Sequence, residues 1–429
     1  MEVIGKRESK ENVPLEEKVQ PLSKRLRPNE PSEDDIKEEI PKSFLEELQD
    51  MHSQVGTVAA AWSRTPIPST FSATTDALIF QWVDIGLYDG APLRTNPKKG
   101  DLVPGSSISP TPIIRLCGTT QSGHSVMLHS HGFVPYFYAS CPSNFKEEDC
   151  AAVKEALEGA IGKKADMKEC VQGIHMVHEK MSIYGYHFNR KSSFLKIYMT
   201  LPTLVAKARG IFEDGLHIAG YEFSRYSTYE SNVPHVLRFM IDKDISGCNW
   251  LELPAGSYSI RNGQEKTSRC QFEVDIVYNN IISHSTDGEY GKLAPVRILS
   301  FDIECMGRKG VFPSALEDPV IQIANVVSEQ GCDIPILRNV FVLGTCKNIV
   351  GANVFQFETE GELLEAWASF VRDVDPDIMT GYNIDNFDIP YLMDRGKALK
   401  LSRDYFSWGR LQNTYVFYFH YYNKSFIRV

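Results

Sequence analysis

The sequence lacks paired cysteine motifs, a secretory signal and long apolar runs, which are the features of several protein classes. None of its nine cysteines forms a C-x-x-C pair, and the thiols are scattered along the chain. This spacing predicts neither a zinc ribbon nor a dithiol redox motif, and it is typical of reduced cysteines in a cytosolic or nuclear protein. No secretory signal is visible, nor any apolar run of roughly 20 residues, the length of a membrane-spanning helix. We therefore expect no contact with a membrane.

The sequence also lacks an excess of basic residues. It has 45 lysines and arginines against 55 aspartates and glutamates, a formal net charge of −10. Half of this charge lies in residues 1–50, where fourteen acidic residues face nine basic ones. Contact with nucleic acid therefore has to rely on local basic patches. Arg308-Lys309 and Lys397 with Lys400 are candidates, although solvated surface charge is the plainer interpretation of each pair.

Residues 1–65 are rich in Glu, Lys and Pro and poor in aromatic side chains. Such a composition buries too little apolar surface to offset the entropy of folding, so we predict a disordered segment. Within it, Lys24, Arg25 and Arg27 fit a short basic nuclear-import signal, a pattern that is also common by chance. The apolar content of the whole chain, 42%, is sufficient for two or three domains in the remainder.

Two carboxylates occur on a predicted buried strand. In Ile298–Glu304, I-L-S-F-D-I-E, alternate residues point to the same face. Asp302 and Glu304 therefore project together, Phe301 and Ile303 point into a core, and the apolar run suits a strand covered on both faces. Neighbouring carboxylates repel each other and favour a cation, and their hard oxygen atoms suit Mg²⁺ or Mn²⁺. An ordinary strand edge is the simpler interpretation of D-x-E alone.

A third carboxylate follows about eighty residues later. Asp377–Tyr382 predicts a short strand, Asn383–Asn386 a turn, and Phe387–Leu399 a helix that tolerates Pro390 in its first turn. Asp388 lies at the N-terminus of that helix, where the helix dipole favours a negative charge. Helix capping and catalysis explain Asp388 equally well from the residues alone.

Together, the two segments resemble the Exo I and Exo II motifs of the proofreading exonuclease of family B DNA polymerases. Exo I, D-x-E, corresponds to Asp302 and Glu304, and Exo II, N-x-x-x-(F/Y)-D, to Asn383, Phe387 and Asp388. The resemblance implies that Asp302, Glu304 and Asp388 bind two Mg²⁺ or Mn²⁺ ions that promote phosphodiester hydrolysis. It also implies that Asn383 and Phe387 bind the primer 3′ end of single-stranded DNA. Core packing is a simpler role for Phe387.

Further segments narrow the resemblance to the delta catalytic subunits of this family. They are His131–Tyr138 (H-G-F-V-P-Y-F-Y), Ser182–Tyr186 (S-I-Y-G-Y), Gly247–Gly256 (G-C-N-W-L-E-L-P-A-G) and Phe301–Gly310 (F-D-I-E-C-M-G-R-K-G). The resemblance covers about Asp76 to about Arg410. It implies DNA replication in the nucleus, with accessory delta subunits and a sliding clamp as partners of the family's C-terminal part. Judged from the residues alone, an aromatic-rich strand such as His131–Tyr138 could be a platform on which the bases of a single-stranded nucleic acid stack. Such strands more often belong to the hydrophobic core.

The predicted fold is a multidomain chain of the α/β and α+β classes. A mostly-β N-terminal domain is expected at 66–291, with the OB-like and RNA-recognition-like modules that the resemblance implies. An incomplete RNase H-like 3′–5′ exonuclease domain is expected at 292–410. In the first domain, Glu147–Leu157 and Leu204–Asp214 predict helices and Phe272–Ile282 a strand.

In the second domain, Val320–Val327 and Asn339–Leu343 predict strands. Thr359 and Glu362 form a capping box ahead of a helix. That helix carries one apolar stripe, made of Leu363, Trp367, Phe370, Val371 and Val374. Strands followed by a helix and a further strand suit an RNase H-like sheet.

Two features depart from the family pattern. Exo III, Y-x-x-x-D, supplies a fourth carboxylate in the family, but only Asp394 and Asp404 follow Asp388, and neither has a tyrosine four residues before it. Residues 411–429 form a divergent aromatic tail, which could be a strand and which we interpret as a replaced continuation, as from an unspliced or alternative transcript. We expect a metal site one ligand short, with little or no nuclease activity, and no polymerisation without palm, fingers and thumb.

Two other functions are open from the sequence. The chain could be a non-catalytic module that binds single-stranded DNA or a replication partner. Salt-dependent DNA binding that survives the loss of Asp302 and Glu304 would identify such a module. The chain could also be an independent RNase H-like nuclease, although the family-like segments upstream of the nuclease motifs argue against this.

Overall fold

The computed structural model describes residues 62–94, 110–142, 144–162, 169–180 and 191–412, and the backbone of 417–421 and 424–428. The chain separates into two compact units, Met1–Val58 and Ala59–Val429, and all described residues belong to the second. Several predictions lie outside the described residues: the disordered segment up to residue 61, the nuclear-import signal of Lys24, Arg25 and Arg27, and the segment Ser182–Tyr186. In the described part, every helix is too short or too polar to cross a membrane.

Seven strands between residues 78 and 284 form one β-sheet. Its order is β11–β8–β1–β2–β3–β10–β9, and β3 pairs with β10 in parallel while the other pairs are antiparallel. The strands are β1 (Leu78–Gly90), β2 (Thr111–Thr120), β3 (Ser125–His131), β8 (Trp250–Leu253), β9 (Tyr258–Ile260), β10 (Phe272–Val277) and β11 (Ile282–His284). The predicted single strand Phe272–Ile282 is wrong, because a 3₁₀ turn at Tyr278–Asn280 sends the chain to another part of the sheet.

A four-stranded sheet has the order β5–β6–β4–β7. Its strands are β4 (Tyr136–Ser140), β5 (Val171–Lys180), β6 (Ser192–Met199) and β7 (Thr228–Tyr229). Helices α2 (Cys150–Ile161) and α3 (Pro202–Asp214) share a buried core with this sheet and confirm both predicted helices. The chain order β4–α2–β5–β6–α3–β7 is the βαββαβ order of ferredoxin-like folds, which agrees with the implied RNA-recognition-like module. Helix α4 (His235–Asp242) follows.

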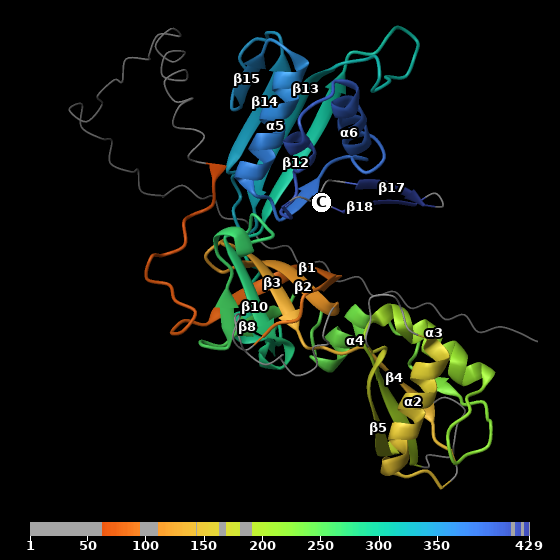
Figure 1. The fold of residues 1–429 in the computed structure, drawn as a ribbon. Coiled ribbons are helices and arrows are strands. Elements are labelled where there is room, and N and C mark those ends of the chain that lie inside the picture. The colour runs from red at the N-terminus through yellow and green to blue at the C-terminus, as the bar shows by residue number, and fades with distance from the viewer. Residues whose placement is uncertain are drawn as a thin grey trace, which may run out of the picture. The chain divides into compact units, whose positions relative to one another are not determined.

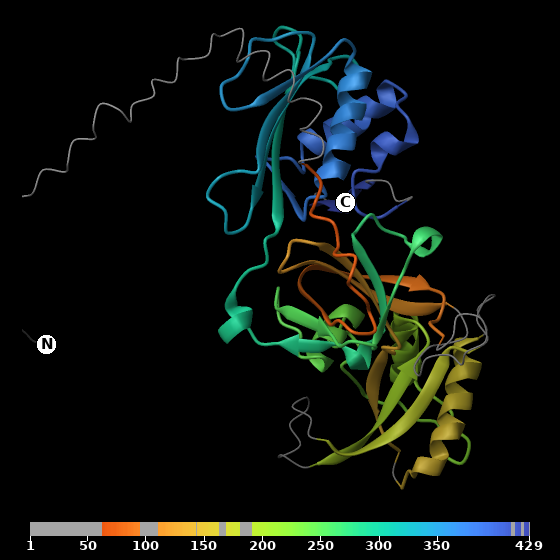
Figure 2. The same ribbon diagram turned by 90° about the vertical axis from the view of Figure 1, so that its left-hand side faces the viewer.

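A five-stranded sheet, in the order β15–β14–β13–β12–β16, carries the nuclease motifs. Its strands are β12 (Arg297–Cys305), β13 (Val320–Glu329), β14 (Leu337–Leu343), β15 (Asn353–Phe357) and β16 (Ile378–Thr380). Helices α5 (Glu360–Val374) and α6 (Asp388–Ala398) lie on the same face of the sheet (Figures 1 and 2). The strands and helices predicted for this part are confirmed, with bounds that differ by at most two residues.

Helix α5 forms as its local sequence predicts. Thr359 Oγ1 accepts the backbone N–H of Glu362 at 3.3 Å, and the Glu362 carboxylate accepts that of Thr359 at 3.1 Å, which is the predicted capping box. The apolar stripe is buried, with exposed fractions of 0–1% for Leu363, Trp367, Phe370, Val371 and Val374. The Trp367 indole also donates to Asn325 Oδ1 at 2.9 Å, which satisfies a buried amide of β13.

The aromatic tail contains a strand pair. The backbone of β17 (Phe417–Tyr421) pairs antiparallel with that of β18 (Lys424–Arg428). This agrees with the strand interpretation of the tail. The side chains of residues 413–429 lie outside the described residues, and the origin of the tail stays a prediction.

A buried ion-pair cluster joins the seven-stranded sheet to the five-stranded sheet. Asp377 precedes β16 and accepts hydrogen bonds from Arg64 Nη2 at 2.7 Å, Arg410 Nη2 at 2.6 Å and Thr119 Oγ1 of β2 at 2.7 Å. Asp375 pairs with the Nε atoms of both arginines, at 2.9 and 2.6 Å. Burial acts to raise the pKa of Asp377, but Arg410 and Arg64 outweigh burial and hold that pKa below its ordinary value. The cluster therefore fixes the chain at the point where β16 joins β12.

Candidate active site

Strand β12 presents two of the predicted carboxylates on one exposed face. Phe301 and Ile303 are 3% and 4% exposed and lie in the core, whereas Asp302 and Glu304 are exposed to solvent. This is the predicted alternation. The expectation of a strand covered on both faces is wrong at this end, because α5 and α6 pack on one face of the sheet and leave the carboxylate face open.

The turn after β16 passes very close to β12. A Cβ atom on Gly381 would lie 2.4 Å from the carbonyl oxygen of Phe301, so only glycine fits between the two segments. Asn383 has a φ of 57°, a left-handed conformation that asparagine adopts more readily than most residues. Its carbonyl accepts the N–H of Phe387 at 3.1 Å, which turns the chain into α6. The sequence of this turn thus directs the start of α6 toward β12.

Asp388 is the first residue of α6, and its side chain is buried, with 1% of the residue exposed. Its Oδ1 accepts the backbone N–H of Ile303 at 3.1 Å, across 85 residues of sequence. Ile303 lies between Asp302 and Glu304, so this hydrogen bond brings the third carboxylate to the predicted pair. Phe387, whose side chain makes no capping hydrogen bond, is the N-cap residue of α6, and Asp388 lies in the first turn, where its negative charge is also favourable, so both predicted roles of Asp388 stay open.

The charge and the oxygen donors of these carboxylates suit the binding of a cation. Burial raises the pKa of Asp388 above its ordinary value, the hydrogen bond from Ile303 opposes this, and the charge of Asp302 raises the pKa further. Carboxylate oxygens are the donors that Mg²⁺ and Mn²⁺ prefer. Within the described ranges, however, no three Asp, Glu, His or Cys side chains stand close enough to share an ion. The chemistry of these donors fits a divalent cation, and the shared metal site stays a prediction.

Phe387 packs against two aromatic rings. Its centroid lies 5.4 Å from that of Tyr391 and 5.5 Å from that of Phe312, the latter at an interplanar angle of 72°. Phe387 is half-buried, so core packing accounts for part of its ring, while Phe312 is 75% exposed. The sequence reasoning missed Phe312. The available signal was the run R-K-G-V-F-P at Arg308–Pro313, which places apolar side chains in a loop directly after D-x-E.

The loop between β12 and β13 is held in place although its apolar side chains are exposed. Arg308 Nε donates to Asp318 Oδ1 at 3.1 Å, and the Tyr391 hydroxyl donates to the Asp318 carbonyl at 2.7 Å. Four large apolar side chains of this loop are 55–75% exposed: Met306, Val311, Phe312 and Leu316. An ordered apolar surface beside carboxylates is suited to contact with nucleobases.

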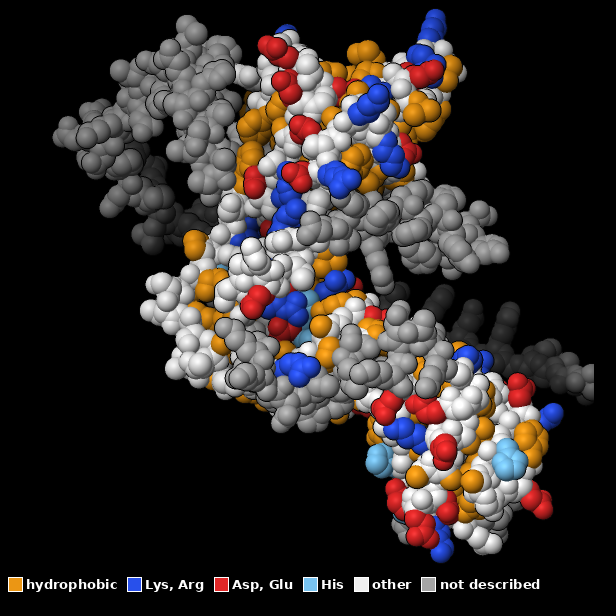
Figure 3. Space-filling view, viewed as in Figure 1, with side chains coloured by type: hydrophobic (Ala, Val, Ile, Leu, Met, Phe, Trp, Pro, Cys, Tyr) orange, Lys and Arg blue, Asp and Glu red, His pale blue; other side chains and the backbone are white. Residues whose placement is uncertain are grey.

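The predicted basic patches supply few unpaired cations. Arg308 pairs with carboxylates of its own loop, and Lys397 pairs with Asp394 at 2.8 Å. Lys309 and Lys400 form no ion pair in the part of the chain that the structure describes. Acidic and basic side chains are interspersed over α5 and α6 on the face in Figure 3. Electrostatic attraction of DNA to this face therefore depends on isolated cations.

Two family models match the chain. Residues 226–424 match the exonuclease domain of DNA polymerase family B, and residues 132–206 match the N-terminal domain of DNA polymerase delta catalytic subunit-like proteins. The chain belongs to the family B DNA polymerases. This confirms the resemblance carried by the Exo I and Exo II segments. The first match begins well before residue 292, so the domain boundary expected there stays a prediction.

Similar proteins include DNA polymerase delta catalytic subunits from animals and plants. That of Drosophila melanogaster is 44% identical over 365 residues, 83% of this chain and 32% of the relative. That of Arabidopsis thaliana is 44% identical over 376 residues, 87% of this chain and 33% of the relative. A solved family B DNA polymerase from the hyperthermophilic archaeon Pyrobaculum calidifontis has a TM-score of 0.47 and 23% identity, over 79% of this chain and 35% of that one. The chain spans about a third of the length of the curated relatives it matches.

Proposed function

We propose that this chain acts in DNA replication, in the nucleus, as part of a delta-type DNA polymerase catalytic subunit. Within it, residues 297–410 contribute to a 3′–5′ exonuclease site that acts on single-stranded primer ends. The observation that carries this proposal is the 3.1 Å hydrogen bond from Ile303 to Asp388, which joins the Exo II segment to the Exo I strand. The match to the family B exonuclease domain supports the same function.

Each predicted site residue has a role in this proposal. Asp302, Glu304 and Asp388 would bind Mg²⁺ or Mn²⁺, which supplies a Lewis acid and an activated water for phosphodiester hydrolysis. Asn383, exposed in the turn before α6, would contact the 3′-terminal nucleotide. Phe387, together with the exposed ring of Phe312, would bind the terminal bases by stacking.

The expected activity of these 429 residues by themselves is low. No Tyr-x-x-x-Asp follows Asp388, so the residues present supply three of the four carboxylates that the family resemblance implies. A site with fewer ligands binds at least one ion more weakly, and two-metal hydrolysis needs both ions. For the whole protein, we propose DNA polymerisation as the activity, with accessory delta subunits and a sliding clamp as partners. Nuclear import through Lys24, Arg25 and Arg27 belongs to the same proposal.

A second candidate function is non-catalytic binding of single-stranded DNA or of a replication partner. It is favoured by the absence, among the described residues, of three side chains placed to share a metal ion. Binding of a labelled oligonucleotide that weakens with salt, but that survives Asp302→Asn and Glu304→Gln, would support this function over the first.

Calorimetric titration of the 429-residue chain with Mn²⁺ tests the proposed site. Asp302→Asn and Glu304→Gln should each weaken Mn²⁺ binding by more than about tenfold, since even substitutions outside the ligand shell have effects of that size. Asp333→Asn is the matched control, because Asp333 is an exposed carboxylate in the β13–β14 loop. Unchanged Mn²⁺ affinity in both site variants would overturn the metal site. Robust 3′ trimming of a labelled single strand, abolished by Asp302→Asn, would overturn the expectation of low activity.

A further inference from the structure

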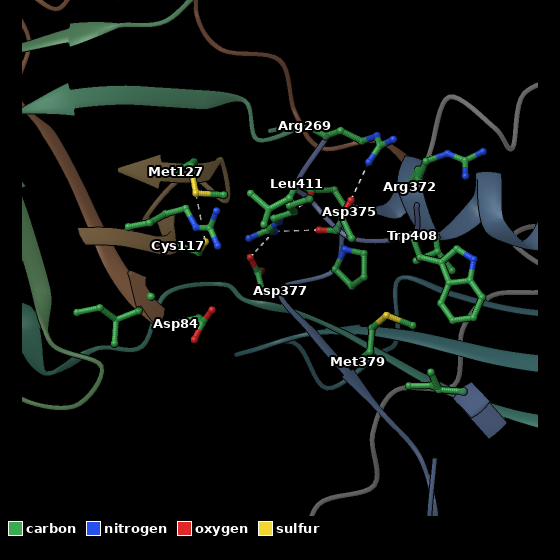
Figure 4. A pocket seen from close by; sticks show the side chains of 18 of the residues that line it. Asp84, Cys117, Met127, Arg269, Arg372, Asp375, Asp377, Met379, Trp408 and Leu411 are labelled. Atoms are coloured by element: carbon green, nitrogen blue, oxygen red, sulfur yellow. Dashed lines mark hydrogen bonds and ion pairs between the residues drawn. The ribbon is translucent and has the colours of Figure 1, made fainter. Parts of the chain in front are cut away.

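A cavity of about 690 Å³ lies between strands β1 and β2 and the chain from the end of α5 to Leu411 (Figure 4). Its volume is in the range of about 300–1,000 Å³ that is usual for small-molecule sites. The apolar part of its lining includes Ile85, Leu87, Met379 and Trp408. None of the three carboxylates of the candidate active site lines it.

Three arginines that line this cavity have no carboxylate partner among the described residues. They are Arg115 on β2, Arg269 ahead of β10, and Arg372 near the end of α5. Arg269 donates to the carbonyl of Gly409 at 2.8 Å, and Arg372 donates to the carbonyl of Asp404 at 3.0 Å. These neutral acceptors position the guanidinium groups without balancing their charge. Arg269 and Arg372 also lie near each other (Figure 4), and the pKa of Arg269 is lowered first by burial and then by the charge of Arg372, against a smaller opposing effect of the Asp404 carboxylate.

The other charges of the lining do not cancel these arginines. The ion-pair cluster borders the cavity, but its two carboxylates are balanced by its own two arginines. Two more carboxylates, Asp84 and Asp385, line the cavity, and both are exposed to solvent. In Figure 4, Asp84 lies on the opposite side of the cavity from Arg269. The side formed by Arg269 and Arg372 is therefore positive and suits an anion.

Tyr88 gives the cavity a fixed aromatic wall. Its hydroxyl and His129 Nδ1 are 2.9 Å apart, and His129 Nε2 and Glu273 Oε1 are 3.0 Å apart. Glu273 is fully buried and accepts a further hydrogen bond from Ser268 Oγ at 2.6 Å. This chain of hydrogen bonds holds the ring in one orientation, and the guanidinium carbon of Arg115 lies over the ring, 5.6 Å from its centroid. A fixed ring beside a cation can stack on a base while the cation binds a phosphate.

We propose that this cavity binds a nucleotide, with Arg115, Arg269 and Arg372 as its phosphate contacts and Tyr88 as the wall on which its base stacks. Guanidinium groups bind phosphate oxygens through two parallel hydrogen bonds, which suits these residues to the role. The nucleotide is either a free nucleoside triphosphate or a unit of a single strand, since both present a base and phosphate. The proposal does not rest on the exonuclease site.

Fluorescence titrations of the 429-residue chain with two probes test this proposal. The probes are N-methylanthraniloyl-dATP and a fluorescein-labelled oligothymidylate, both titrated in EDTA so that the metal-dependent site does not contribute. Arg115→Gln and Arg372→Gln should each weaken the binding of at least one probe by about tenfold, as expected for the loss of a charged hydrogen bond. Arg403→Gln is the matched control, because Arg403 is exposed and does not line the cavity.

The two probes distinguish the sources of the nucleotide. A loss confined to the dATP analogue identifies a free nucleotide, and a loss confined to the oligonucleotide identifies a single strand. Arg115→Lys keeps the charge and should retain more affinity than Arg115→Gln, which separates phosphate contact from misfolding. Absence of binding of both probes by the unsubstituted chain, or equal affinities in all variants, would overturn the proposal. In EDTA, Asp302→Asn should change the affinity for neither probe. The nucleotide-binding proposal and the exonuclease proposal can therefore be refuted independently of each other.

Discussion

Replacement of Gly381 by alanine should disturb the contact that brings Exo II to Exo I. The new Cβ would lie 2.4 Å from the carbonyl oxygen of Phe301 and 2.4 Å from Cγ2 of Ile384. Non-bonded atoms of this kind prefer separations of about 3.5 Å, so each overlap is about 1 Å. The Ile384 side chain can change its rotamer. The Phe301 carbonyl cannot yield as easily, because it belongs to β12, which is hydrogen-bonded to β13.

The expected cost follows from this geometry. Additional atoms in a well-packed site usually cost about 1–3 kcal/mol, because side chains leave their rotamers and backbone has to shift. A shift of the turn away from β12 also carries Asp388 away from the N–H of Ile303, a bond that is 3.1 Å long in this structure. Gly381→Ala should therefore lower the free energy of unfolding and also weaken Mn²⁺ binding.

Urea unfolding followed by tryptophan fluorescence measures the first effect, and calorimetry measures the second. Gly210→Ala is the matched control, since Gly210 lies in α3 and a Cβ there meets no atom within 4 Å. That variant should be neutral or more stable by about 0.4–1 kcal/mol. If Gly381→Ala unfolded at the same urea concentration as the unsubstituted chain and bound Mn²⁺ equally well, the reasoning about this close approach would be refuted.

Three further substitutions test other parts of the fold. The raised pKa of Asp388 means that its protonation favours the folded state, a contribution that is present at low pH and lost as the pH rises through the folded-state pKa. Asp388→Asn should therefore be at least as stable as the unsubstituted chain at neutral pH and show less pH dependence, as measured by urea unfolding across the acidic range. Glu360→Gln should cost about 3–5 kcal/mol in the same assay, because it breaks the buried pair with Arg395, whose two hydrogen bonds are 2.7 and 2.8 Å long. Thr359→Ala should cost about 1 kcal/mol through loss of the α5 cap, whereas Thr359→Ser should not, and equal stability of both variants would contradict the capping role.

The elements that carry the site were predictable because their signals are local. The alternation of Phe301, Asp302, Ile303 and Glu304 follows from the geometry of any strand that has one buried face. The capping box at Thr359 satisfies backbone groups within a single turn, and the stripe of α5 follows from the helical period. Such patterns do not depend on where the rest of the chain lies.

Predictions were wrong where a distant segment determined the outcome. Phe272–Ile282 has the alternation of one strand, but its two ends pair with different partners, β3 and β9 on one side and β8 on the other. The apolar run that begins at Ile298 suggests a strand covered on both faces, but the placement of α5 and α6 leaves one face open. The local sequence of a segment determines neither which strands it pairs with nor which face of the sheet the helices cover.

The sequence by itself determined the candidate residues of Exo I and Exo II, the family, helices α2, α3, α5 and α6, and strands β12, β13, β14 and β16. Only the tertiary structure decided that Asp388 bonds Ile303, that Phe312 packs against Phe387, and that unpaired arginines face one cavity. The physical reason is the range of the interactions. Strand alternation and helix caps involve neighbours along the chain, whereas these contacts join residues tens to hundreds of positions apart, whose distances are set by the packing of whole sheets and helices.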